Sequence, residues 1–202
     1  MTCSKNTWII FTADHGEMLG DHHMSQKNLF FEGSAHVPLL IMPPQGRSLP
    51  QNISVEAPTD LVDLYPTILA MAGLSSPVSV SGRNLLEPVP MDRIFFGNSL
   101  NRNFCVMEEK LKLVYSAVGD HVLLFDLNTD PMEQHNLAED PAWQERKAKL
   151  WKLLLEHTAQ YTPEALDENG QFLTYEAPHF PGDVPGRWFG FHYHDYSVDT
   201  FH

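Results

Sequence analysis

The stretch that most constrains the fold is residues 7–44, where two apolar runs enclose a polar insert. The first run, at residues 8–11, has the composition of a strand buried on both faces. The second run covers residues 37–42 and stops at two prolines, where a strand ladder cannot continue. We therefore expect two strands of an α/β sheet, at residues 7–12 and 37–42, joined by a long polar segment.

The polar insert (residues 13–36) gathers titratable side chains immediately after the first strand. They are Asp14, His15, Glu17, Asp21, His22, His23, Lys27 and Glu32. In open α/β sheets, ligands bind outside the carboxyl ends of the strands, and carboxylates with imidazoles suit a divalent cation. The insert is therefore the candidate functional site. The competing interpretation is structural: an Asp–His pair after a strand can also just cap a turn.

An acidic composition limits the classes of partner. The chain of 202 residues carries a formal net charge of −13 at pH 7, whereas a nucleic-acid surface needs clustered Lys and Arg. Two cysteines, Cys3 and Cys105, are too few for a disulfide framework, and no apolar run reaches transmembrane length. We expect a globular protein without a nucleic-acid or membrane partner. An anionic substrate agrees with this charge, because one cation and one lysine reverse its sign locally.

The second quarter of the chain has the pattern of a helix followed by a linker. Apolar residues recur at helical spacing over residues 60–72, Thr59 or Asp60 is the expected cap, and Gly73 the expected stop. Pro66 moves the expected start toward Asp63, because proline fits the first turn of a helix. Residues 74–91 are rich in proline and serine. They predict a boundary between a first part, residues 1–91, and a second part, residues 92–202.

The second part has the shorter period of strands. Four short runs, at residues 93–98, 104–108, 111–116 and 121–127, are separated by turn residues and predict an antiparallel meander. An N-cap followed by proline, Asp140 and Pro141, then opens a helix that we expect to end near residue 160. Its expected inward residues are Trp143, Leu150, Trp151 and Leu154. The aromatic-rich residues 161–202 are expected to wrap over the rest.

The ordered set of motifs resembles the type I sulfatases of the alkaline-phosphatase-like superfamily. The set comprises TADHGEMLGDH at residues 12–22, Lys27, FEG at 31–33, VPL at 37–39, VDLYPTI at 62–68, LFDL at 124–127, DP at 130–131 and NL at 136–137. The resemblance implies a mixed central sheet flanked by helices, followed by a small four-stranded antiparallel sheet with a C-terminal helix. The element order expected here matches the second half of that plan.

The resemblance also implies roles for residues of the insert. Asp14 and His15 match metal ligands, completed in the family by carboxylates from the N-terminal part; Ca²⁺ is the expected cation, with Mg²⁺ or Mn²⁺ as alternatives. Lys27 matches the lysine that contacts the sulfate group, so it is expected to be both catalytic and substrate-binding. His22 is a further candidate for the substrate pocket. An exposed pair formed by His22 and His23 is an equally good interpretation.

The nucleophile implied by the resemblance is a formylglycine made from Cys or Ser in a Cys/Ser-X-Pro/Ala-X-Arg motif. Neither Cys3 nor Cys105 lies in such a motif. We therefore expect the C-terminal portion of a sulfatase that is inactive without its N-terminal half. The expected substrate is a sulfate ester, either a sulfated carbohydrate or an aryl or alkyl sulfate. The expected location is extracytoplasmic: periplasmic, secreted or lysosomal.

Two other functions fit the same residues. One is a phosphonate monoester or phosphodiester hydrolase of the same superfamily, whose loops have the same Asp-His-Gly-Glu pattern. The other is a non-catalytic remnant or interaction module without a nucleophile. A chain that opens on a central strand is also expected to leave an apolar strand edge uncovered, which favours binding to the N-terminal half or self-association.

Overall fold

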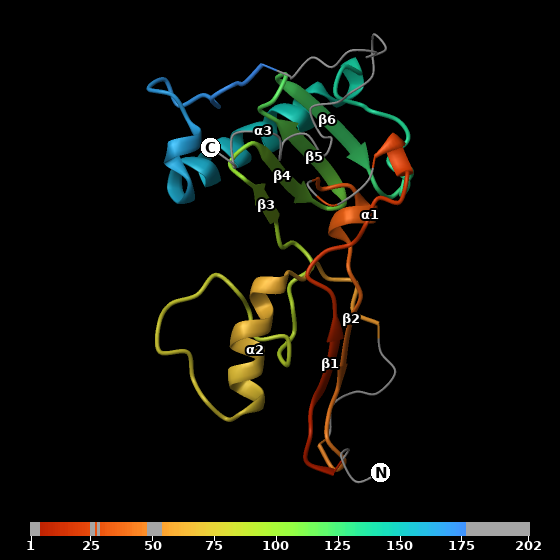
Figure 1. Cartoon of the computed structure of the whole chain (residues 1–202), viewed down its shortest axis with the longest axis vertical. Helices are drawn as coiled ribbons and strands as arrows, with labels where there is room; N and C mark the ends of the chain where they lie inside the picture. The colour runs from red at the N-terminus through yellow and green to blue at the C-terminus, as the bar shows by residue number, and fades with distance from the viewer. Residues whose placement is uncertain (1–4, 25–26, 28, 48–53, 177–202) are drawn as a thin grey trace, which may run out of the picture. The chain divides into compact units, whose positions relative to one another are not determined.

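The protein is a mixed α/β fold, shown in Figure 1 as a computed structural model that describes residues 5–24, 27, 29–47 and 54–176. Its described residues form two compact units. The first comprises residues 5–14, 37–47 and 54–95, and the second residues 15–24, 27, 29–36 and 96–176. The sequence-based division at residues 91 and 92 kept the polar insert with its flanking strands. In the structure the insert belongs to the second unit, because its contacts are with the second unit's sheet.

The first unit contains a two-stranded antiparallel sheet, β1 (Ile9–Thr12) and β2 (Leu39–Met42). Ile9 pairs with Met42 and Thr12 with Leu39. The two strands were predicted correctly, but the expected burial on both faces is wrong. Ile9 is 43% exposed and Leu40 62% exposed, because each strand has one neighbour and alternate side chains point away from the described core.

The helix of the first unit begins with a capping box. A short 3₁₀ turn, Leu61–Asp63, leads into α2 (Leu64–Met71). The Asp60 carboxylate accepts from the Val62 N–H, and the Asp63 carboxylate accepts from the Asp60 N–H at 2.8 Å. The cap at Asp60 and the stop at Gly73, with φ of 71°, are as predicted. Apolar residues that predicted the helix, Leu61, Tyr65 and Ile68 among them, are exposed.

Asp63 is the polar centre of the first unit. Its carboxylate is fully buried and accepts from Nη1 and Nη2 of Arg93 and from the Arg83 N–H at 2.8 Å. Desolvation opposes ionisation of Asp63, but the Arg93 guanidinium and the N–H donors of Arg83 and Asp60 outweigh it and lower its pKa. This ion pair therefore joins the start of α2 to the segment that precedes the second sheet.

The second unit is built on a four-stranded antiparallel sheet with strand order β3-β4-β5-β6. The strands are β3 (Phe95–Ser99), β4 (Asn103–Glu108), β5 (Leu111–Ser116) and β6 (His121–Asp126). The predicted meander is confirmed, with boundaries that differ by at most two residues. Short tight turns join the strands, and the left-handed conformation of Gly119 before β6 (φ 78°) is one that glycine adopts without strain.

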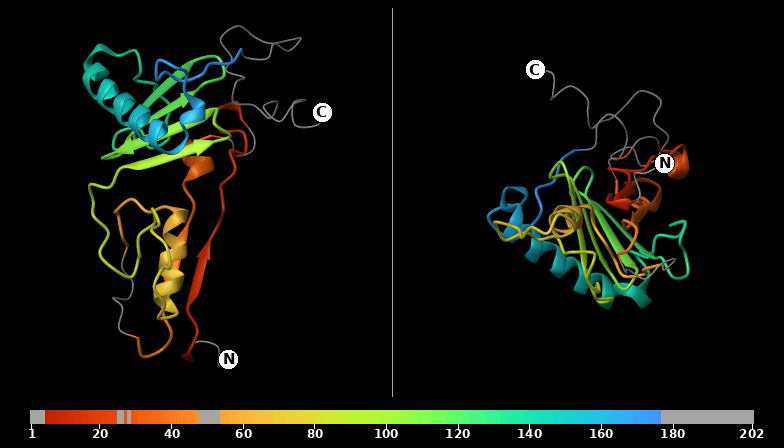
Figure 2. Two further views of the ribbon diagram at one scale, coloured as in Figure 1. Left: turned by 90° about the vertical axis from the view of Figure 1, so that its left-hand side faces the viewer. Right: turned by 90° about the horizontal axis from the view of Figure 1, so that it is seen from below.

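One long helix, α3 (Gln144–Tyr161), crosses one face of this sheet (Figure 2). It follows a 3₁₀ turn, Pro141–Trp143, whose Ala142 N–H donates to the Asp140 carboxylate, as predicted. Leu150 and Leu154 are buried against the sheet. No helix of the described residues is long and apolar enough to cross a membrane.

The segment after α3 adds to the same core as far as residue 176. Phe172 is buried and lies against Tyr115, Phe104 and Trp151, with ring centroids 4.6–5.5 Å apart. Tyr175 forms a bridge with Val118. The expected wrap is confirmed for this part. Residues 177–202, which include His179, His192 and His194, lie outside the described residues.

Candidate functional site

The polar insert is closed at its base by hydrogen bonds between its two ends. The Gly16 N–H donates to the Ser34 carbonyl at 2.7 Å, and the Glu17 N–H donates to the Gly33 carbonyl at 2.9 Å. A Cβ on residue 16 would lie 2.1 Å from the Gly33 carbonyl oxygen, so only glycine allows this approach. The close contact fixes the backbone next to His15.

Four apolar side chains fill the interior of the insert: Met18, Met24, Leu29 and Phe31 are all buried. The His22 ring stacks on Phe31 with centroids 4.1 Å apart, and Phe31 lies 5.8 Å from the Phe125 ring of β6. The insert is therefore anchored to the sheet through an aromatic contact. One face of His22 is occupied by Phe31, and its role in a substrate pocket stays a prediction.

The structure brings together two of the predicted site residues, His15 and Lys27. Lys27 Nζ lies 2.7 Å from His15 Nε2, and His15 Nδ1 lies 2.7 Å from the Gly16 carbonyl. A lysine ammonium only donates, so Nε2 is the acceptor and Nδ1 carries the proton that is donated to Gly16. The Lys27 backbone is also held, because the buried Ser34 hydroxyl donates to the Lys27 carbonyl at 2.7 Å.

Asp14 precedes His15 in the chain and is exposed at the end of β1. An imidazole that donates Nδ1–H to a carbonyl has the tautomer of many metal-binding histidines, with Nε2 as the acceptor nitrogen; in this structure Lys27 occupies Nε2. One carboxylate and one imidazole supply only part of a coordination sphere, since Ca²⁺ takes six to eight oxygens. Within the described residues, no three His, Cys, Asp or Glu side chains gather as a metal site would require. The donor set thus fits part of a metal site.

A buried ionic cluster connects the insert to the sheet, and sequence reasoning missed it. Lys112 of β5 donates to Glu32 Oε1 at 2.5 Å and to Glu133 Oε1 at 2.7 Å. Desolvation disfavours the ammonium, but Glu133 and Glu32 outweigh this and raise the Lys112 pKa. A lysine inside the apolar run of residues 111–115 was the signal available in the sequence, because an unpaired charge is not tolerated there.

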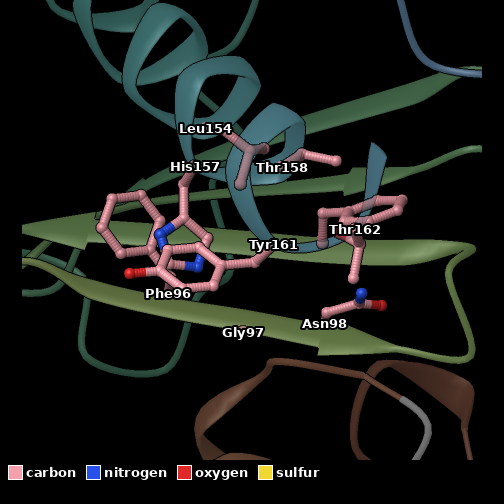
Figure 3. Close-up of a pocket in the computed structure, with 9 residues that line it drawn as sticks. Phe96, Gly97, Asn98, Leu154, His157, Thr158, Tyr161 and Thr162 are labelled. Atoms are coloured by element: carbon pink, nitrogen blue, oxygen red, sulfur yellow. The ribbon is translucent and has the colours of Figure 1, made fainter. Parts of the chain in front are cut away.

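A pocket of about 170 Å³ lies where α3 meets β3, away from the residues predicted for the site (Figure 3). It is lined by Phe96, Gly97, Asn98, Phe104, Leu154, His157, Thr158, Tyr161 and Thr162. The His157 ring stacks on Phe96 with centroids 3.9 Å apart, and burial lowers the His157 pKa. None of Asp14, His15, His22 and Lys27 lines this pocket, so its aromatic contacts belong to the helix–sheet packing.

A solved structure defines the class of protein. The phosphonate monoester hydrolase of Agrobacterium radiobacter matches with a TM-score of 0.61 and 32% identity, over 81% of this chain and 38% of that protein. The chain therefore shares its fold with part of this hydrolase.

Sequence comparison identifies the family more specifically than the structural match does. The family model described as Sulfatase matches residues 2–74. The uncharacterized sulfatase YidJ of Escherichia coli is 32% identical over 165 residues, which cover 76% of this chain and 32% of that protein. The choline-sulfatase of Rhizobium meliloti is 36% identical over 174 residues, 80% of this chain and 33% of that protein. The chain belongs to the sulfatase family. It spans about a third of the length of these relatives, which fits a C-terminal portion.

Proposed function

We propose that this chain is the C-terminal portion of a sulfatase that hydrolyses sulfate esters with a divalent cation. The observation that carries the proposal is the 2.7 Å contact between Lys27 Nζ and His15 Nε2. A turn that only caps a strand has no need of an ammonium group twelve residues away in sequence. A site for an anionic ester does, because cationic groups must face the sulfuryl oxygens.

Each side chain has a role in this proposal. The Lys27 ammonium binds the sulfate group and offsets negative charge on its oxygens or on the departing alkoxide. The Asp14 carboxylate and His15 Nε2 would hold the cation, with Ca²⁺ favoured and Mg²⁺ or Mn²⁺ as alternatives. Because Nε2 has a single lone pair, which Lys27 occupies in this structure, the Lys27 ammonium would turn from Nε2 to the sulfate oxygens when the cation binds. When bound, such a cation polarises the oxygens of the sulfate ester. His22, beside Phe31, would border the organic part of the substrate.

The proposal includes inactivity of the chain on its own. Cys105 is fully buried, and burial raises its pKa to about 12, so it supplies no thiolate at neutral pH. A positioned lysine does not replace a nucleophile. The attacking group, a formylglycine, and the remaining metal carboxylates would come from an N-terminal part. The exposed apolar side chains of β1 and β2 support such a partner.

The substrate class and location follow from the family in this proposal. We expect a sulfated carbohydrate or an aryl or alkyl sulfate as substrate. An extracytoplasmic location, periplasmic, secreted or lysosomal, suits degradation of such esters.

The test is an assay with 4-nitrophenyl sulfate in the presence of Ca²⁺, Mg²⁺ or Mn²⁺. The 202-residue chain is measured alone and together with an N-terminal sulfatase segment that carries formylglycine. We expect no turnover by the chain alone, and turnover by the combination that falls sharply in Lys27→Ala. Lys27-dependent turnover by the chain alone would contradict inactivity. A combination that assembles but stays inactive would favour the non-catalytic interaction module.

A second candidate is a phosphonate monoester hydrolase, which the 32% identity to the Agrobacterium radiobacter enzyme favours. The same combination is assayed with an aryl phosphonate monoester beside the aryl sulfate. A higher kcat/KM for the sulfate supports the first proposal, and a higher value for the phosphonate supports the second.

A further inference from the structure

We propose that Lys112 and Glu133 are positioning residues for the candidate site, because they fix the one segment that holds both Lys27 and the backbone beside His15. The inference rests on the proposed function only in taking Lys27 and His15 as site residues. Neither Lys112 nor Glu133 touches the two site side chains in the contacts described above, so they act through the backbone of residues 30–34.

The first step is the attachment of that segment to the sheet. Lys112 Nζ donates to the Phe30 carbonyl at 2.8 Å as well as to Glu32 Oε1 and Glu133 Oε1. Glu133 Oε2 accepts from the Glu32 N–H at 2.7 Å. Glu32 is therefore held at both its side chain and its backbone. Lys112 and Glu133 are each 3% exposed, so water is largely excluded from the bond between them, whereas the Glu32 side chain is 30% exposed.

The second step leads from the held segment to the site. The Ser34 hydroxyl donates to the Lys27 carbonyl, and the Ser34 carbonyl accepts from the Gly16 N–H. The Gly33 carbonyl accepts from the Glu17 N–H. Both sides of the Lys27–His15 contact are thus bonded to residues 33–34, which directly follow Glu32. A displacement of Glu32 moves the supports of both side chains together.

The chemistry of the cluster agrees with a positioning role. Buried ion pairs are seldom more stabilising than well-packed apolar side chains of similar size. An apolar residue at position 112 would leave the sheet packed but would lose the bonds of the ammonium group to the Phe30 carbonyl and the Glu32 carboxylate. The directional bonds therefore specify where the segment lies.

The experiment measures the ¹⁵N chemical shift of His15 Nε2 in the folded chain. This shift reports the contact with Lys27, because Nε2 accepts the hydrogen bond from the Lys27 ammonium. Lys27→Met gives the shift without the contact. In Glu133→Gln one of the two carboxylate oxygens becomes an NH2 group, which only donates and would face either the Lys112 ammonium or the Glu32 N–H. Lys112→Met removes the bonds to the Phe30 carbonyl, Glu32 Oε1 and Glu133 Oε1, and leaves the bond from the Glu32 N–H to Glu133 Oε2. Lys110→Met, which replaces an exposed lysine in the turn before β5, is the matched control.

We expect Glu133→Gln and Lys112→Met to move the His15 Nε2 shift most of the way to the Lys27→Met value, and Lys110→Met to leave it unchanged. Protection of the β5 and β6 amides from hydrogen exchange should persist in Glu133→Gln. A wild-type His15 shift in folded Glu133→Gln and Lys112→Met would overturn the inference and leave the cluster a purely stabilising role. If Lys112→Met does not fold, Glu133→Gln decides. The readout requires no turnover, so failure of the proposed sulfatase activity would be a separate result.

Discussion

Replacing Asp63 by asparagine should open α2 locally. The Asp63→Asn side chain would keep the shape of the original but lose the charge that pairs with Arg93, and its amide group would face the N–H donors of Arg83 or Asp60. Asp63 is fully buried and the Arg93 side chain is 11% exposed, so the pair belongs to the buried class. Breaking such a pair from one side costs about 3–5 kcal/mol, because the remaining charge stays buried without a partner.

The expected measurement is hydrogen exchange of the α2 amides. About 3–5 kcal/mol corresponds to a loss of protection on the order of 10²–10³-fold, since each 1.4 kcal/mol is about tenfold. Asp60→Asn is the control, because asparagine is an equally good N-cap and Asp60 does not pair with Arg93 in the described contacts. If the α2 amides of Asp63→Asn are as well protected from hydrogen exchange as those of the wild type, the reasoning that the Asp63–Arg93 ion pair stabilises α2 is refuted.

Four other outcomes are expected. Because folding lowers the pKa of Asp63, ionised Asp63 stabilises the folded state fully above the unfolded pKa of 3.8, and this stabilisation is lost as pH falls through the lower folded pKa. Hydrogen exchange of the α2 amides should therefore accelerate below about pH 4 in the wild type and not in Asp63→Asn. In the complete enzyme, Lys27→Ala should lower kcat more than it raises KM, by a factor on the order of 10²–10³, and steady-state kinetics with Asp14→Ala should show a larger loss. Calorimetry of the chain alone should show no tight Ca²⁺ binding, because two protein ligands are too few; a sub-micromolar dissociation constant would reveal further ligands. Light scattering should show self-association through the exposed apolar strands, and a stable monomer at high concentration would contradict it.

The parts of the fold that were predictable have local signals. Asp140 and Pro141 mark the start of α3 because capping and the fixed φ of proline act within one turn. Gly119 marks a strand connection because a positive φ favours glycine. The burial of β1 was not predictable in this way. An apolar run shows what a strand can bury, whereas the exposure of Ile9 depends on which other segments cover it.

The site was predictable only as a set of residue types. Spacing and the resemblance to sulfatases placed Asp14, His15 and Lys27 in one insert, but their distances depend on how the insert closes at Gly16. Lys112 in its apolar strand indicated that a buried charge needs partners, but their identity was not predictable, because Glu32 and Glu133 are far from Lys112 in the chain. Such long-range pairing is decided by the register of β5 beside the insert, which no local pattern encodes.

Because Cys105 is completely buried, the rate at which its thiol is labelled can report how often the sheet opens. Its thiol lies in the middle of β4 and is fully buried, so a reagent such as a disulfide dye reaches it only when the packing around this strand opens. In a Cys3→Ser variant, the labelling rate at Cys105 divided by the rate of an unstructured thiol gives the fraction of time that the sheet is open. Cys105 can thus report, in any variant of the insert, whether the supporting sheet has stayed intact.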